Sequence, residues 1–67
     1  MFFRINEERF KVSAVSRYFK NGFSTSTKKY YLTIWFGAKD RLFYFDTEEE
    51  LNNTIIYLDC VFKVKPI

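Results

Sequence analysis

The apolar residues of this chain change their spacing once, close to Asp46. Before that point apolar and polar residues tend to alternate, which is typical of strands that bury one face. After it the apolar residues recur at helical spacing, at Leu51, Ile55, Leu58 and Phe62. A chain of 67 residues can build only one layered core. We therefore predict a single domain over residues 1–67 with an α+β fold, in which the strands come first and one helix follows.

The alternating part of the chain predicts an antiparallel sheet. Its clearest strand signal is Tyr30–Phe36, which is rich in aromatic and β-branched residues. Asn21-Gly22 is a pair typical of tight hairpin turns, and we expect it to follow the preceding strand. We predict a three- or four-stranded β-meander with strands at residues 2–5, 9–19, 29–36 and 41–46.

Residues 47–63 form the predicted helix. Thr47 is followed three residues later by Glu50, which is the spacing of a capping box at a helix start. Three consecutive glutamates also place negative charge in the first turn, where the helix dipole favours it. We expect the apolar stripe of this helix to pack on one face of the sheet and to leave the other face without cover.

The composition argues against catalysis. The chain has no histidine, so it lacks the usual base for a serine or cysteine nucleophile. Its glycines, Gly22 and Gly37, are better explained as turn residues than as a phosphate-binding loop. The consecutive glutamates diverge on a helix and cannot surround one cation. We expect a protein that is not an enzyme and that uses neither a metal ion nor a cofactor.

The cysteine content and the hydrophobicity of the chain indicate in which cellular compartment the protein acts. Cys60 is the only cysteine, so no internal disulfide can form, and this fits a reducing environment. The apolar runs fall far short of the roughly 20 residues that a membrane span needs. Charged side chains also begin at Arg4, which is too close to the N-terminus for the apolar segment of a signal peptide. We expect a cytoplasmic protein with no membrane partner.

The two faces of the predicted sheet differ in character. Residues of one parity form the more apolar face, which we assign to the core: Tyr30, Leu32, Ile34 and Phe36, with Phe10, Val12 and Ala14. Tyr31 and Trp35 point to the opposite side. The neighbouring strands would place Lys11 and Arg17 beside them, together with Tyr44 or Phe43. The predicted partner-binding residues are Lys11, Arg17, Tyr31, Trp35 and Tyr44.

This second face has three interpretations. Trp, Tyr and Arg are the usual energetic anchors of protein interfaces, so the leading hypothesis is a binding protein that docks on another macromolecule and inhibits or modulates it. The alternative is a single-stranded nucleic-acid binder, because residues 1–45 hold nine basic and three acidic residues and bases stack on exposed aromatic rings. In the third, Tyr31 and Trp35 are ordinary packing residues of a curled sheet.

The back of the predicted helix is a second-choice interface. Cys60 lies almost opposite the apolar stripe, with Ile56 nearby and Tyr57 on one flank. Cysteine and isoleucine are among the most frequently buried residue types. We therefore expect a protein partner, a second copy of this chain included, to cover this side. The alternative is that these are scattered exposed apolar residues that need no partner.

The segment Leu42–Leu51, a strand that runs into an acidic helix start, resembles short accessory proteins of phages and mobile elements. That class includes inhibitors of host defence, among them anti-CRISPR proteins. The resemblance implies a protein that blocks a surface of a host nucleic-acid-processing or defence complex without chemistry, and it assigns no role to any residue. Many such inhibitors mimic DNA with acidic surfaces, whereas this chain has an isoelectric point near 9.1 and departs from that pattern.

Overall fold

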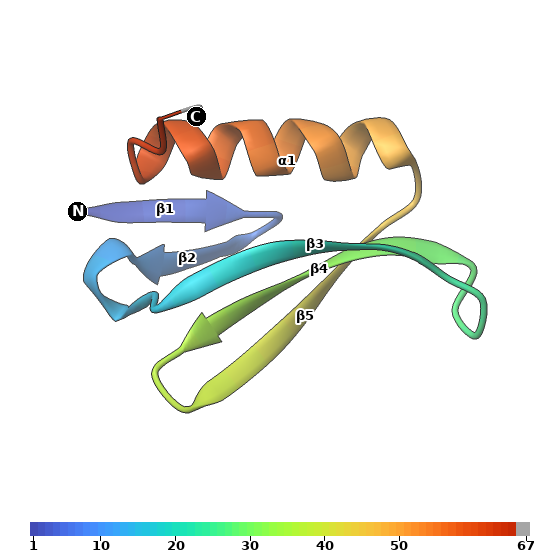
Figure 1. The fold of residues 1–67 in the computed structure, drawn as a ribbon, viewed down its shortest axis with the longest axis horizontal. Helices are drawn as coiled ribbons and strands as arrows, with labels where there is room; N and C mark the ends of the chain where they lie inside the picture. Colours follow the sequence, from blue (N-terminus) through green and yellow to red (C-terminus); the bar gives the residue numbers. More distant parts are fainter. Residues whose placement is uncertain (66–67) are drawn as a thin grey trace.

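The computed structural model, which describes residues 1–65, contains two antiparallel sheets and one α-helix (Figure 1). A hairpin is formed by β1 (Phe2–Ile5) and β2 (Glu8–Lys11). A three-stranded sheet follows in chain order, with β3 (Arg17–Ser24), β4 (Lys29–Phe36) and β5 (Lys39–Phe45). The helix α1 (Glu48–Val61) packs against that sheet. The predicted α+β class, an antiparallel meander followed by one helix on one sheet face, is confirmed.

Several predicted boundaries agree with the structure. β1 and β4 have the predicted bounds, and β5 begins two residues earlier than expected. Thr47 is the N-cap of α1, because its hydroxyl oxygen accepts a hydrogen bond of 3.2 Å from the backbone N–H of Glu50. The Thr47 hydroxyl donates in turn to the Glu50 carboxylate, also at 3.2 Å. Residues 66–67 of the predicted domain lie outside the described residues.

The strand predicted at residues 9–19 is wrong as a continuous element. β2 ends at Lys11, a short 3₁₀ turn spans Val12–Ala14, and β3 begins at Arg17. Backbone bonds from Val12 N–H to the Met1 carbonyl and from Val15 N–H to the Val12 carbonyl close the hairpin and turn the chain toward the second sheet. Ala14 is exposed in this turn, so its predicted place in the core is also wrong.

The turn predicted at Asn21-Gly22 is wrong as well. Both residues lie inside β3, where the register slips between Lys20 and Gly22 as it does at a β-bulge. Gly22 has φ +103°, a conformation that suits glycine, so the residue serves a bulge and not a turn. The turn itself lies between β3 and β4, and the Lys28 N–H donates a bond of 2.8 Å to the Ser24 carbonyl across it.

The core lies between the three-stranded sheet on one side and α1 with the hairpin on the other. Its deepest side chains are Leu32 and Ile34 from β4 and Leu51 and Leu58 from α1. The hairpin and β5 complete the core with aromatic and aliphatic residues: Phe3, Ile5, Phe10, Phe43 and Phe45. Full burial of each large apolar side chain contributes about 1.5–3 kcal/mol.

The helix and the hairpin cover the same face of the three-stranded sheet. The Tyr18 hydroxyl of β3 donates to Asp59 of α1, and Phe10 of β2 stacks on Phe36 of β4 with ring centres 5.3 Å apart. In Figure 1 α1 and β1 lie together above β3, β4 and β5. The opposite face of the sheet therefore has no described element packed on it. Within residues 1–65, no helix combines the length and the hydrophobicity needed to cross a bilayer.

Candidate functional site

The uncovered face of the three-stranded sheet, which we call the open face, is built from three cross-strand rows. Strand register aligns Arg17 with Trp35 and Asp40, Phe19 with Thr33 and Leu42, and Gly22 with Tyr31 and Tyr44. Directly opposed side chains in an antiparallel sheet lie about 4.5–5.5 Å apart at their Cβ atoms. The open face is thus a contiguous surface defined by Arg17, Phe19, Tyr31, Thr33, Trp35, Asp40, Leu42 and Tyr44.

The structure brings together four of the predicted partner-binding residues. The Arg17 guanidinium lies 4.9 Å from the centre of the Trp35 ring, a cation–π arrangement. Tyr31 and Tyr44 stack with ring centres 5.4 Å apart and planes 20° apart. Trp35 and Tyr31 are both half-buried, so they are neither fully exposed nor enclosed in a core. Arg17, Tyr31, Trp35 and Tyr44 therefore form one layer across the three strands.

Phe19 and Leu42 are open-face residues that sequence reasoning missed. They are 43% and 45% exposed, and they flank Thr33, which is only 3% exposed. The Thr33 hydroxyl donates a bond of 2.6 Å to the side-chain oxygen of Asn21, so its polar group is satisfied below this apolar pair. The parity of Leu42 matches that of Tyr44, and the parity of Phe19 matches that of Arg17 within the predicted strand 9–19. Both signals were therefore available in the sequence.

Two of the predicted flanking residues lie elsewhere. Lys11 belongs to β2, which pairs with β1 and not with the three-stranded sheet, so it does not adjoin Trp35. The cause is the break in the predicted strand 9–19. Phe43, the alternative to Tyr44, is buried in the core. Tyr44 is therefore the aromatic residue that β5 contributes to the open face.

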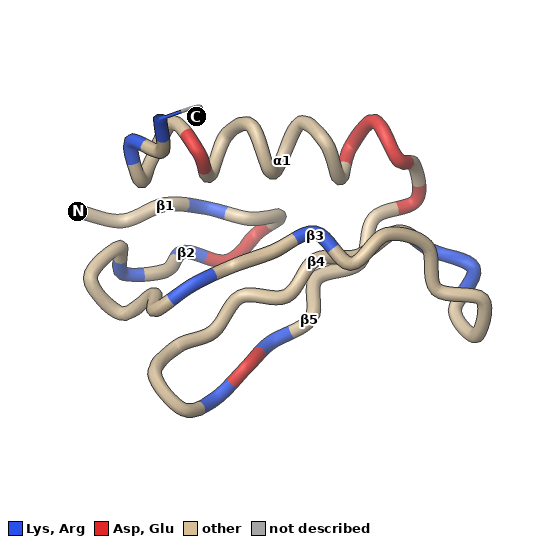
Figure 2. Tube along the Cα trace, in the orientation of Figure 1, with Lys and Arg blue, Asp and Glu red and all other residues tan. Residues whose placement is uncertain are grey.

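Charge on the open face is balanced. Arg17 and Asp40 lie in the same row, and at the far end Lys29 forms an ion pair of 3.1 Å with Asp46. The basic residues are spread over the β1–β2 hairpin, the three-stranded sheet and the segment after α1, while Glu48, Glu49 and Glu50 gather in the first turn of α1 (Figure 2). The excess positive charge of residues 1–45 is therefore not concentrated on the aromatic face.

Arg41 of β5 points to the opposite side and joins the sheet to the hairpin. Its guanidinium donates to both carboxylate oxygens of Glu8, with Nη2 3.0 Å from Oε1. It also lies 5.1 Å from the centre of the Phe43 ring and 5.4 Å from that of Phe10. The hydrogen bond from Arg41 lowers the pKa of Glu8 below its usual value. Through this bond and its contacts with the two rings, Arg41 joins β5 to β2 on the covered face.

A groove of about 410 Å³ continues from the open face around the edge of β5. Leu42 and Tyr44 line one side of it, and the hairpin turn with Asn6 and Glu7 lines the other. Leu42 and Tyr44 thus belong both to the open face and to this groove.

The three residues of the second-choice interface do not form one surface in the structure. Ile56 is 61% exposed and Cys60 is exposed too, so the predicted outward side of the helix is confirmed. Tyr57 turns toward β1, where its hydroxyl accepts a hydrogen bond of 3.1 Å from the backbone N–H of Arg4. Ile56 and Cys60 thus remain as separate exposed residues, and Tyr57 belongs to the junction between helix and hairpin.

In the part of the chain that the structure describes, no three His, Cys, Asp or Glu side chains gather as a metal ion would require. No protein-family model, curated protein or solved structure matches this chain.

Proposed function

We propose that this chain is a non-enzymatic binding protein that docks its open face on another protein and thereby inhibits or modulates that protein. The observation that carries the proposal is the exposure of Phe19, Leu42 and Tyr44 in one aromatic and apolar layer that neither α1 nor the hairpin covers. Contiguous exposed apolar surface rimmed by polar residues is typical of interaction sites.

The residue types of the open face favour a protein partner. Trp, Tyr and Arg dominate the binding energy of protein interfaces, and here Arg17 already packs on Trp35, and Tyr31 on Tyr44. Because stacked rings and a cation held over a ring lose little rotamer freedom on binding, this layer is preorganised. Phe19 and Leu42 would then be the groups that enter the partner's surface.

The charge balance separates this proposal from nucleic-acid binding at the same face. Phosphate recognition needs cations that neutralise the backbone. On the open face Arg17 shares its row with Asp40, and Lys29 is paired with Asp46. Such a face matches a partner of mixed charge better than a polyanion. The absence of histidine from the chain supports an action by binding without catalysis.

We also propose which class of protein the open face binds. The resemblance to phage and mobile-element accessory proteins suggests a host nucleic-acid-processing or defence complex. Blocking such a complex requires only that the open face cover a working surface, which is within the means of a small protein without catalytic groups.

Site-specific photo-crosslinking tests the proposal. A photoreactive phenylalanine analogue at position 19 should capture a discrete protein in cells, and the same analogue at Ile56 serves as the matched exposed control. Adding Leu42→Ser should abolish the adduct at position 19. Equal capture from positions 19 and 56, or capture that Leu42→Ser leaves unchanged, would overturn the proposal.

The identity of the captured species gives the remaining outcomes. An adduct with a second copy of this chain, together with a concentration-dependent dimer in sedimentation velocity, would identify the partner as the chain itself. An adduct with nucleic acid in place of protein would contradict the proposal. Circular dichroism should show that the Leu42→Ser protein is folded, since Leu42 is exposed.

A further inference from the structure

The outer face of the β1–β2 hairpin is a cationic surface that the proposed function does not use. Alternation places Phe3, Ile5 and Phe10 inward in the core. The residues between them face outward, and strand register opposes Phe2 to Lys11 and Arg4 to Arg9. This surface, which we call the hairpin patch, consists of Phe2, Arg4, Arg9 and Lys11.

The register of the hairpin places Arg4 and Arg9 directly opposite each other. The Arg4 backbone N–H donates to the Tyr57 hydroxyl of α1, so it points away from β2. Arg4 and Arg9 are therefore a non-hydrogen-bonded pair, in which opposed Cα atoms lie about 4.5 Å apart and the side chains are at their closest. Directly opposed like charges destabilise a sheet, so this arrangement costs stability unless an anion lies between them.

The cations of the hairpin patch also lack acidic partners among residues 1–65. Elsewhere Lys20 lies 4.0 Å from Glu48, Lys29 pairs with Asp46 and Arg41 with Glu8. The ion pairs within the described residues include none of Arg4, Arg9 and Lys11. Arg17, Lys28 and Lys39 form no ion pair among these residues either, so the distinguishing feature of the hairpin patch is that three cations without an ion pair share one face of one hairpin.

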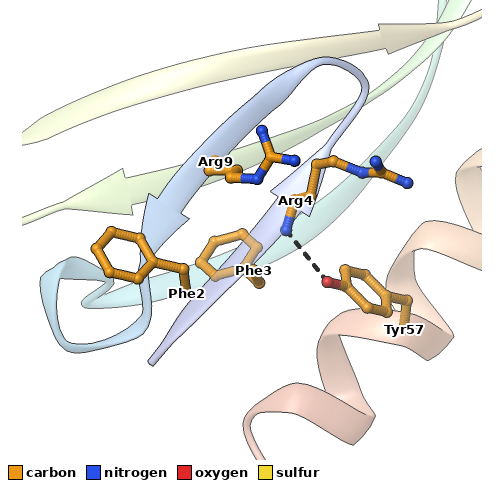
Figure 3. A pocket seen from close by; sticks show the side chains of 5 residues that line it. All are labelled: Phe2, Phe3, Arg4, Arg9 and Tyr57. Carbon is orange, nitrogen blue, oxygen red and sulfur yellow. Dashed lines mark hydrogen bonds between the residues drawn. The ribbon is translucent and has the colours of Figure 1, made fainter.

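The paired arginines and neighbouring aromatic side chains line a shallow pocket that is open to solvent. The pocket has a volume of about 340 Å³ and is lined by Phe2, Phe3, Arg4, Arg9 and Tyr57 (Figure 3). Phe2 is 64% exposed at one end, and the Tyr57 ring borders the other. The hydrogen bond to Arg4 fixes the Tyr57 hydroxyl, so the wall that α1 contributes is held in place.

We infer that the hairpin patch binds single-stranded nucleic acid. One phosphate lies between the guanidinium groups of Arg4 and Arg9, which match phosphate oxygens in fork geometry. An unpaired base stacks on Phe2, and Lys11, directly opposite Phe2, contacts a neighbouring phosphate. A paired base could not reach the ring, so the site selects single strands. The concave pocket fits a nucleotide better than the flat surface of a bilayer.

The hairpin patch and the open face lie on different parts of the molecule. The hairpin packs on the covered face of the three-stranded sheet, and the open face is the other side of that sheet. A nucleic acid on the patch would leave the open face accessible to a protein. This inference therefore stands apart from the proposed function, and either can fail alone.

Fluorescence anisotropy with a labelled twelve-nucleotide dT strand tests the inference at several salt concentrations. Each of Arg4→Gln and Arg9→Gln should weaken binding, and the double variant, which removes both contacts to the shared phosphate, should reduce the slope of log K against log salt by about 0.7, the value for one single-strand phosphate contact. Phe2→Ala should weaken binding about 5-fold to 150-fold without changing the slope, because it removes one stacked base.

Three comparisons guard against simpler explanations. Lys28→Gln removes one exposed charge in the β3–β4 turn and is the matched control; a loss equal to that of Arg9→Gln would show general electrostatics and overturn the site. Equal affinity for a duplex of matched length would overturn the single-strand selectivity. Phosphatidylserine vesicles that bind in an Arg9-dependent way, while the dT strand does not, would identify a membrane surface and overturn the nucleic-acid assignment.

Folding of the variants is checked by thermal unfolding. Arg9→Gln should unfold at the same temperature as the parent protein or at a higher one, because it relieves the repulsion from Arg4. Weaker binding with undiminished stability is the signature of a ligand site. A lower unfolding temperature with no effect on binding would show that Arg9 is structural and would overturn the inference.

Discussion

The hydroxyl of Tyr18 donates a hydrogen bond of 2.7 Å to the carboxylate of Asp59, and this bond ties the first strand of the three-stranded sheet to the end of the helix. The Tyr18 ring also packs against Phe62, with ring centres 5.5 Å apart. Partial burial and the bond to Asp59 raise the pKa of Tyr18 above its ordinary value. A tyrosine with a raised pKa resists ionisation, so this contact holds α1 on the sheet as long as Tyr18 keeps its proton.

Alkaline stability should depend on this contact. Because the folded-state pKa is raised, the stabilisation is fully present below the unfolded pKa of about 10 and is lost as the pH rises above it. Tyr18→Phe should cost about 1.5 kcal/mol at pH 7, the lower end for a hydrogen bond to a charged group, because both groups are partly exposed. Urea titrations should show this difference shrinking above pH 10. A difference that does not change with pH would contradict the linkage.

The successes and failures of sequence reasoning about the fold have a common cause. Alternation reports which residues share a face, and it placed Leu32 and Ile34 in the core correctly because β4 is central and contacts everything around it. Alternation does not report which sheet a strand joins. It continues almost unbroken from Phe10 to Tyr18, although the chain leaves one sheet and enters another in between.

The same limit applies to the candidate site. Trp35 and Tyr31 could be placed on a shared face from β4 alone, and Arg17 joined them because β3 keeps the expected parity. Lys11 could not be placed, because its assignment depended on a strand that the 3₁₀ turn interrupts. The pairing of Arg4 with Arg9 depends on the register of a hairpin whose two-residue turn has Asn6 at φ +57°. Asn-Glu is a weak turn signal compared with Asn-Gly.

The two glycines should differ in their tolerance of a side chain. A Cβ atom at Gly22 or at Gly37 would meet no atom within 4 Å, so only the backbone conformation decides the cost. Gly37 has φ +68°, in the left-handed region, and Gly37→Ala should cost about 1–2 kcal/mol. Gly22 has φ +103°, outside that region, and Gly22→Ala should cost about 3 kcal/mol. Chemical unfolding of both variants measures this order, and equal losses would contradict it.

Gly37→Asn is the control for the backbone argument. Asparagine tolerates the left-handed conformation better than alanine does, so this variant should be more stable than Gly37→Ala. An asparagine variant that is less stable than the alanine variant would show that a factor other than backbone strain operates at this turn.

The helix should depend on its inward side and not on its back. Leu58 is fully buried against the sheet, and Leu58→Ala should cost about 2–5 kcal/mol through lost burial and the cavity that remains. Ile56→Ala, two residues earlier, should change the free energy of unfolding by less than about 0.5 kcal/mol, because Ile56 is exposed. Thermal unfolding of the isolated chain measures both. A large loss from Ile56→Ala would show that a second copy covers the back of the helix.

Arg41 should stabilise the fold mainly by covering two rings and only slightly by its charge on Glu8. Its guanidinium lies over Phe43 and Phe10 at once, and Arg41→Ala should cost about 1 kcal/mol through lost stacking and stem packing. Glu8→Gln should have a smaller effect, because the Glu8 side chain is 52% exposed and solvent screens the pair. The pKa of Glu8 is lowered in the folded state, so the contribution of Glu8 to stability is present at neutral pH and disappears as the pH falls through that pKa.

Urea unfolding at pH 7 and pH 3 should therefore show that Arg41→Ala lowers the free energy of unfolding at both values, whereas Glu8→Gln lowers it at pH 7 only. Equal losses from the two variants at pH 7, both abolished at pH 3, would show that the ion pair and not the stacking is what holds β2 on β5.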